Sequence, residues 1–151
     1  MTIQKNIMSL FDRLQGARGE KLQKEKEAGA AFMEENKTKE GVVELPSGIQ
    51  YQILKEADGP KPSPNSMVKA HYRGALLDGK EFDSSFKRNQ PFSARLTQLI
   101  KGWQEVLPLM PAGSTWRLWI PSDLAYGDNG TGGIPGGATL MFDIELLEIL
   151  S

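Results

Sequence analysis

The residues from Tyr126 to Phe142 form a glycine-rich segment between a tyrosine and a strongly apolar run, a composition that first suggests phosphate binding. Two known phosphate-binding patterns are absent from it. It has no Gly-x-x-x-x-Gly-Lys-Ser/Thr run, and Pro135 stands at the last glycine of Gly-x-Gly-x-x-Gly. The segment also leads into a predicted strand, so no helix N-terminus follows to bind an anion. What remains is an uncharged flap beside aromatic residues, which favours an apolar ligand.

Residues for nucleophilic or metal chemistry are scarce. The chain has one histidine, His71, and no cysteine, so disulfides, thiol nucleophiles and thiolate metal sites are excluded. A Ser-His-Asp triad or a histidine-rich metal site would depend on His71, which lies in an alternating segment that points it outward. We therefore expect no metal and no cofactor, and a phosphate-binding or hydrolytic enzyme is disfavoured.

Length and composition place these residues in one ordinary domain with an appendage. The chain has 151 residues, of which 39% are hydrophobic and 25% charged, and its net charge is -1. This balance predicts neither a nucleic-acid nor a membrane partner. The N-terminus lacks a secretory signal, no run approaches the roughly 18 apolar residues of a membrane span, and the absence of cysteine fits a reducing compartment. The sequence thus predicts a cytoplasmic protein.

Residues 1–40 are expected to form a helical extension. Apolar residues recur there at three- and four-residue steps, at Ile3, Ile7, Leu10, Phe11 and Leu14. Gly16 and Gly19 are expected to interrupt this stripe, with a second, mostly polar helix from about residue 17 to 36. Two alternatives remain open: the extension is a solvated helix packed loosely on the main domain, or its apolar stripe packs on a second copy of the chain.

Residues 41–151 have the pattern of a second unit. Apolar and polar residues alternate in several short segments, which predicts strands. These segments cover residues 49–53, 67–77, 92–96, 115–120 and 139–150, and Asp78-Gly79 is a tight-turn signal before Phe82. Residues 99–107 have helical spacing. The predicted fold class is α+β: a strongly bent antiparallel sheet of five to six strands wrapped around a short α-helix, preceded by the N-terminal helical extension.

Several phrases in this second unit, taken together and in order, resemble the FKBP family of peptidyl-prolyl cis–trans isomerases, the macrolide-binding immunophilins. They are His71-Tyr72-Arg73-Gly74, Asp78 to Ser85, Leu99-Ile100-Lys101-Gly102-Trp103, Ala125-Tyr126-Gly127 and Ala138 to Asp143. The resemblance covers roughly residues 45–151. The lead-in, Ala31 to Asn36, Gly41-Val42 and Pro46 to Tyr51, is similar to the bacterial Mip-like branch, in which N-terminal helices form a dimer.

The resemblance implies a site position by position. It implies catalytic roles for Tyr72, Asp83 and Tyr126, and substrate or inhibitor contacts from Phe82, Arg88, Phe92, Leu99, Ile100, Trp103, Ile134 and Phe142. Arg88 is expected to support the aspartate and the tyrosine, and Ile134 to form the apolar tip of the flap. Two departures from the family stand out. Gly132 and Gly133 replace bulkier residues in a shorter flap, and Leu99 stands where valine is frequent.

The implied function is isomerisation of X–Pro bonds during protein folding, with proline-containing polypeptides as substrates and macrolides as inhibitors. Aromatic residues in an alternating strand usually belong to a core, so this function depends on the family resemblance. The alternative is a dimeric holdase chaperone, or a module that binds proline segments with incidental turnover. A homodimer through the N-terminal helix would support that alternative, because two linked sites raise the effective concentration of a bound chain.

Overall fold

The computed structural model describes residues 10–151. Within these residues the α-helices are α2 (Leu10–Asn36) and α3 (Lys101–Val106). The strands are β1 (Val42–Glu44), β2 (Gln50–Lys55), β3 (Met67–Leu76), β4 (Glu81–Ser84), β5 (Phe92–Arg95), β6 (Thr115–Ile120) and β7 (Leu140–Ile149). The same part of the chain also contains the short 3-10 helices η1 (Leu96–Gln98), η2 (Leu107–Leu109) and η3 (Ser122–Leu124).

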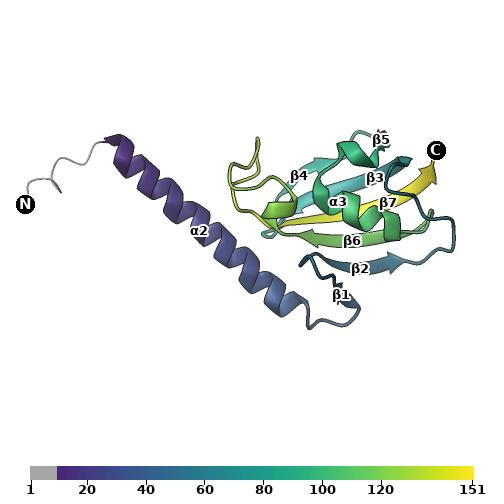
Figure 1. The fold of residues 1–151 in the computed structure, drawn as a ribbon, viewed down its shortest axis with the longest axis horizontal. Coiled ribbons are helices and arrows are strands. Elements are labelled where there is room, and N and C mark those ends of the chain that lie inside the picture. Colours follow the sequence, from purple (N-terminus) through teal and green to yellow (C-terminus); the bar gives the residue numbers. More distant parts are fainter. Residues whose placement is uncertain (1–9) are drawn as a thin grey trace, which may run out of the picture.

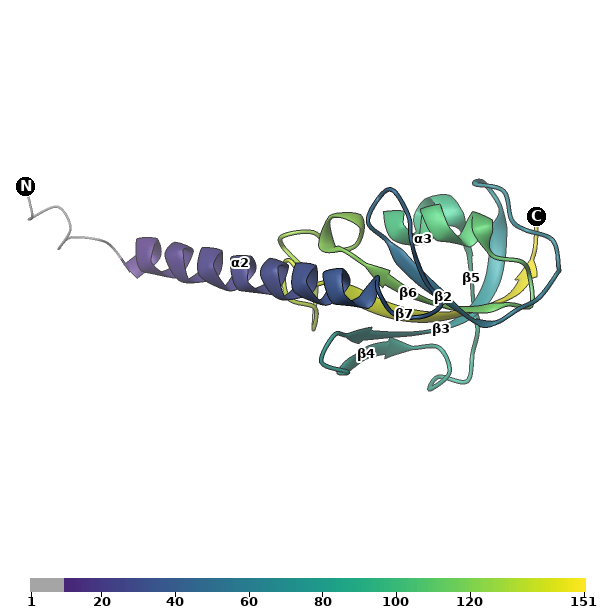
Figure 2. The ribbon, with the colours of Figure 1, turned by 90° about the horizontal axis from the view of Figure 1, so that it is seen from below.

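The seven strands form one antiparallel sheet in the order β1-β2-β6-β7-β3-β4, with β5 paired to β3. The two longest strands, β3 and β7, lie side by side at its centre (Figure 1). The sheet curls, and α3 lies across one of its faces (Figure 2). The predicted α+β class is confirmed. The sheet has seven strands in the described chain instead of five or six, because a three-residue strand such as β1 is too short for alternation to reveal it.

The core fills the space between α3 and the sheet. Its fully buried members include Val106 and Leu107 from the α3–η2 segment and Leu118, Ile120, Leu140 and Ile144 from the central strands. Gly102 lets α3 approach β6 closely: a Cβ at this position would lie 2.6 Å from Ile120 Cγ2. The short helix is therefore fixed against the sheet by packing, since six residues would not form a stable helix alone.

Helix α2 is one continuous element through Gly16 and Gly19, so the predicted interruption at these residues is wrong. A glycine costs about 1 kcal/mol relative to alanine within a helix, which good helix formers on both sides can offset. The expected apolar stripe from Ile3 to Leu14 lies outside the residues whose side chains the structure describes. Within the described chain, no helix is both long enough and apolar enough to cross a membrane.

The C-terminal end of α2 is attached to the sheet by a buried polar contact. Gln50, fully buried on β2, donates from Nε2 to the backbone oxygen of Met33 at 2.8 Å and accepts from Asn36 Nδ2 at 2.9 Å. The opposite end of α2 projects away from the domain (Figures 1 and 2). The helix is thus anchored along one half and free of the domain along the other.

Candidate functional site

A cavity of about 210 Å³ opens on the face of the sheet that α3 covers. It is lined by Tyr72, Phe82, Asp83, Phe92, Leu99, Ile100, Trp103, Tyr126 and Phe142. These residues come from strands β3, β4, β5 and β7, from α3 and the turn before it, and from the loop after η3. Nine of the eleven predicted site residues therefore meet around one cavity, although they are up to 70 positions apart in the chain.

Strand register and one glycine set the cavity wall. Gly74 on β3 is paired with Phe142 on β7 and with Asp83 on β4. A Cβ on Gly74 would lie 2.6 Å from Phe82 Cζ and 2.8 Å from Phe142 Cε1, so only glycine leaves both rings in place. Gly74 belongs to one of the phrases that carry the family resemblance, but residue spacing alone predicts no role for it.

Trp103 forms the floor of the cavity and connects the other rings. Its indole contacts Tyr72, Phe92 and Phe142 edge-on, with centroid distances of 5.4, 5.6 and 5.2 Å. Such arrangements add about 0.5–1.5 kcal/mol per pair to the gain from burial. Trp103 is only 5% exposed, and its indole N–H has no hydrogen-bond partner among the described residues. The floor is therefore mostly aromatic carbon surface, and its one polar group, the indole N–H, is buried and unpaired in the described chain.

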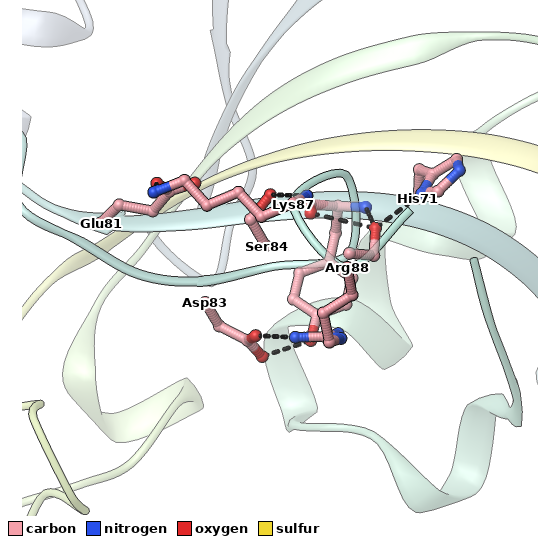
Figure 3. A network of polar contacts seen from close by, with 8 residues as sticks. His71, Glu81, Asp83, Ser84, Lys87 and Arg88 are labelled. Carbon is pink, nitrogen blue, oxygen red and sulfur yellow. Dashed lines mark hydrogen bonds and ion pairs between the residues drawn. The ribbon is translucent and has the colours of Figure 1, made fainter. Parts of the chain in front are cut away.

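One edge of the cavity is polar (Figure 3). The Tyr72 hydroxyl donates to Asp83 Oδ2, and Arg88 donates to Asp83 Oδ1 and, at 3.0 Å, to the Tyr72 hydroxyl oxygen. Arg88 does not line the cavity, and it supports the aspartate and the tyrosine as the family resemblance implies. Both carboxylate oxygens of Asp83 are therefore already engaged by the protein.

These bonds fix the charge states at the edge. Burial opposes ionisation of Asp83, but the hydrogen bonds from Tyr72 and Arg88 outweigh it and lower the pKa of Asp83 below its usual range. Burial and the bond to Asp83 raise the pKa of Tyr72. At neutral pH the site consequently presents a carboxylate, a guanidinium and a protonated phenol.

Ser85 attaches this edge to the sheet, a role that the sequence analysis missed. Its hydroxyl is buried, accepts the backbone N–H of Tyr72 at 2.7 Å and lies 2.8 Å from His71 Nδ1. The imidazole of His71 stacks on the exposed Phe86 ring at 4.6 Å and points away from Asp83 (Figure 3). His71 therefore lies outside the cavity, as its outward position in the strand predicts.

The glycine-rich loop contributes Tyr126 to the rim. This residue is 38% exposed and lines the cavity. Burial and the negative charge of Asp83 raise the pKa of Tyr126, so its hydroxyl stays protonated and can donate. The loop thus places a protonated hydroxyl donor at the cavity rim.

Ile134, expected from the sequence to be the apolar tip of the flap and a substrate contact, lies elsewhere. It is only 7% exposed, belongs to the hydrophobic core and does not line the cavity. A tight turn explains this, because Ile134 and Thr131 exchange backbone hydrogen bonds at 2.7 and 3.1 Å and direct the isoleucine inward. Burying a large aliphatic side chain gains about 1.5–3 kcal/mol, which favours this arrangement.

Comparison with known proteins agrees with this geometry. Residues 59–147 match the model for FKBP-type peptidyl-prolyl cis-trans isomerase, and residues 1–53 match the model for the domain amino terminal to it. The chain belongs to the FKBP-type peptidyl-prolyl cis–trans isomerase family. The Mip-like lead-in of this FKBP chain also has a counterpart, because α2 and β1 lie within the residues that match the amino-terminal model.

Three similar proteins illustrate the relationship. The FKBP-type isomerase FkpA of Aeromonas hydrophila is 48% identical over 121 residues, covering 80% of this chain and 45% of that protein. Outer membrane protein MIP of Legionella longbeachae is 42% identical over 151 residues, covering 96% and 65%. The crystal structure of FkpA from Escherichia coli has a TM-score of 0.87 at 34% identity, covering 97% and 71%. This FKBP chain thus spans roughly half to two thirds of the length of the first two relatives.

Proposed function

We propose that the chain accelerates cis–trans isomerisation of X–Pro bonds in polypeptides. The observation that carries this proposal is the aromatic cavity with Trp103 at its floor and hydrogen-bonding groups only at its rim. Its volume of about 210 Å³ suits a small ring such as that of proline. The family membership of the chain supports the same activity.

The chemistry needs no nucleophile, base or metal. The barrier of about 18–20 kcal/mol reflects amide resonance, which is lost as the C–N bond twists. The planar amide is the more polar state and depends more on solvation. An apolar cavity therefore favours the twisted amide over the planar one, and each tenfold acceleration needs about 1.4 kcal/mol of that difference.

Three groups at the rim orient the substrate in this proposal. The Tyr126 hydroxyl donates to a substrate carbonyl, and the backbone N–H of Ile100 is a second donor, since it makes no backbone hydrogen bond in the described chain. Asp83, ionised and engaged by Tyr72 and Arg88, holds the Tyr72 ring against the cavity. Its negative charge acts on the twisting carbonyl without transferring a proton.

A direct test measures exchange between cis and trans forms of an X–Pro peptide by NMR. We expect acceleration by the wild-type chain and roughly tenfold lower kcat/KM for Tyr126→Phe and for Asp83→Ala, equivalent to about 1.4 kcal/mol each. No acceleration by the wild type would contradict the enzymatic function. Wild-type turnover in both variants would contradict the assigned roles.

The projecting half of α2 favours a second candidate function, a homodimeric holdase chaperone. Residues Gly16 to Lys21 are exposed, and the end of α2 that precedes them projects away from the domain, where a second copy could pack (Figure 1). Deleting residues 1–20 removes this half and keeps the docked half. Sedimentation should then show a change from dimer to monomer, and refolding of a proline-limited protein should weaken while peptide turnover stays constant. A monomeric wild type would contradict the dimer.

Macrolide binding belongs to the same proposal, because a macrolide that inhibits the exchange reaction would occupy the aromatic cavity. Titration calorimetry with Trp103→Ala as the control would test it, and equal affinity for both proteins would place the ligand elsewhere.

We also propose the cytoplasmic location expected from the sequence. One relative is named an outer membrane protein, so recovery of the native protein in the membrane fraction of its cells would contradict this location.

A further inference from the structure

We propose that helix α2 positions the glycine-rich loop, and through it the Tyr126 hydroxyl, by direct contact at residues Leu22, Lys26 and Gly29. This inference rests on the proposed isomerase function for its kinetic consequence, but the contact itself is independent of that function. In this proposal, helix α2 positions a residue of the active site in addition to connecting the domain to the N-terminal residues.

Two glycines on opposite sides of the interface permit the contact. On the helix, a Cβ at Gly29 would collide with Thr139 Oγ1 and lie 3.1 Å from Thr139 Cβ. On the loop, a Cβ at Gly137 would lie 2.8 Å from Leu22 Cδ1, and the φ of +78° at Gly137 also favours glycine. The helix and the loop therefore touch at a separation that other residues at these two positions would not allow.

The docked face of α2 follows helical spacing. Leu22, Gly29, Met33 and Asn36 are partly or fully buried, whereas Ala28, Ala30 and Ala31 are exposed. Lys26 Nζ also lies 2.8 Å from Asp128 Oδ1 on the loop, but these side chains are 42% and 61% exposed. Exposed pairs contribute only about 0–1 kcal/mol, so close packing at Gly29 and Gly137, more than the charge pair, determines where the helix lies.

Backbone hydrogen bonds within the loop connect the contact with α2 to Tyr126. Gly137, held against Leu22, donates its N–H to the oxygen of Gly127 at 2.9 Å. Gly127 follows Tyr126 directly, and the oxygen of Tyr126 accepts the N–H of Gly130 at 3.2 Å. Moving α2 would therefore move Gly137 and Gly127, and with them the residue whose side chain reaches the cavity rim.

The contact is narrow. A hollow of about 330 Å³ separates Arg18 and Lys21 from Asp128, Asn129 and Pro135 on one side of Leu22. A second, of about 390 Å³, lies between Ala30 and Met33 of the helix and Pro121 to Asp123 on the other side. Along this stretch the helix thus holds the loop at a few residues, so a single substitution can loosen its hold.

Gly29→Ala tests the proposal against Gly19→Ala on the same helix. Both substitutions favour the helix itself, but only the first meets Thr139, while a Cβ at Gly19 meets nothing within 4 Å. We expect Gly29→Ala to lower kcat/KM for the peptide roughly tenfold, equivalent to about 1.4 kcal/mol of barrier, and Gly19→Ala to leave it unchanged. Leu22→Ala should lower kcat/KM in the same direction without a clash.

A double-mutant cycle with Tyr126→Phe separates positioning from a general loss of structure. If α2 acts through Tyr126, the loss caused by Tyr126→Phe should shrink in the Gly29→Ala and Leu22→Ala backgrounds. The proposal would be overturned if Tyr126→Phe caused its full loss of kcat/KM in both the Gly29→Ala and the Leu22→Ala backgrounds. It would also be overturned if Gly29→Ala and Leu22→Ala, each alone, had wild-type turnover. Kinetics are measured on the folded fraction, established by circular dichroism.

Hydrogen exchange supplies a readout that does not depend on activity. We expect Leu22→Ala to speed exchange of the Gly130 and Gly137 amides while the central strand amides of β3 and β7 stay protected. Unchanged exchange at both glycines would overturn the contact. If the wild type fails to accelerate isomerisation, the proposed function fails, whereas faster loop exchange in Leu22→Ala still shows that α2 holds the loop.

Discussion

The aromatic cavity and the glycine-rich loop at its rim are adjacent, yet they are held in different ways. The cavity is built from side chains on paired strands and on α3, and edge-on contacts join its rings to Trp103. The loop is held by its own backbone hydrogen bonds and by α2, an element outside the sheet. The difference suggests that the two regions have separate roles. Packing within the sheet fixes the cavity in which the X–Pro bond would rotate, and helix α2 positions the Tyr126 hydroxyl that would orient the substrate.

The largest effect is expected where the cavity is most deeply embedded. Trp103→Ala should abolish measurable turnover and lower the free energy of unfolding by about 3–5 kcal/mol, because it removes a buried ring with several aromatic neighbours. Urea unfolding and peptide exchange would check both values. Trp103→Phe retains an apolar floor and should lose much less of each, so equal losses in the two variants would contradict an apolar-floor mechanism.

A smaller effect is expected at the polar edge of the cavity, where pH provides the test. The lowered pKa of Asp83 means that the folded protein keeps this carboxylate ionised at pH values where an ordinary aspartate begins to protonate. Its contribution to stability is therefore present above the usual aspartate pKa of about 3.9 and is lost as pH falls through the lower, folded value.

We expect kcat/KM to stay constant from pH 7 to about 4 and to fall below that as the Tyr72 and Arg88 bonds are lost. Asp83→Asn should reduce kcat/KM roughly tenfold at neutral pH and remove the acid limb of the profile. An acid limb of unchanged size in Asp83→Asn would assign it to another carboxylate.

On the loop, a side chain added in open space should change ligand preference more than stability. A Cβ at Gly132 meets nothing within 4 Å. Gly132→Leu should therefore leave the free energy of unfolding within about 0.5 kcal/mol of wild type. A partly buried leucine contact is worth about 1 kcal/mol, so the relative affinity for bulky and small proline ligands should change roughly fivefold. Equal changes for all ligands would contradict a role of this loop in specificity.

The smallest effect is expected at the charge pair between α2 and the loop. Lys26→Ala removes the contact with Asp128, but an exposed pair of this kind should change stability by less than about 1 kcal/mol. High salt should screen the same pair and lower the stability of the wild type by a similarly small amount. Thermal unfolding with and without salt would measure this change. A loss of stability well above about 1 kcal/mol would show that charge, and not close packing, holds the helix.

The cavity was largely predictable from the sequence, and the region around the loop was not. Alternation revealed the longer strands, and the order of the phrases from His71 to Asp143 identified the family and its pocket positions. Arg88 lies outside the cavity lining, yet its contacts with Asp83 and Tyr72 follow from the family resemblance. Ser85 and Gly74 also belong to those phrases, so the sequence pointed to both residues. Only the structure shows what they contact.

The sequence by itself determined the longer strands, the family and the chemical character of the cavity, because these depend on residue types and on short-range spacing. The tertiary structure alone decided that Ile134 is buried and that the docked face of α2 includes Gly29 and Asn36. A glycine that permits close contact and an asparagine that bonds a buried glutamine carry no apolar periodicity. Their role becomes visible only when the surface opposite them, at Thr139 and Gln50, is in place.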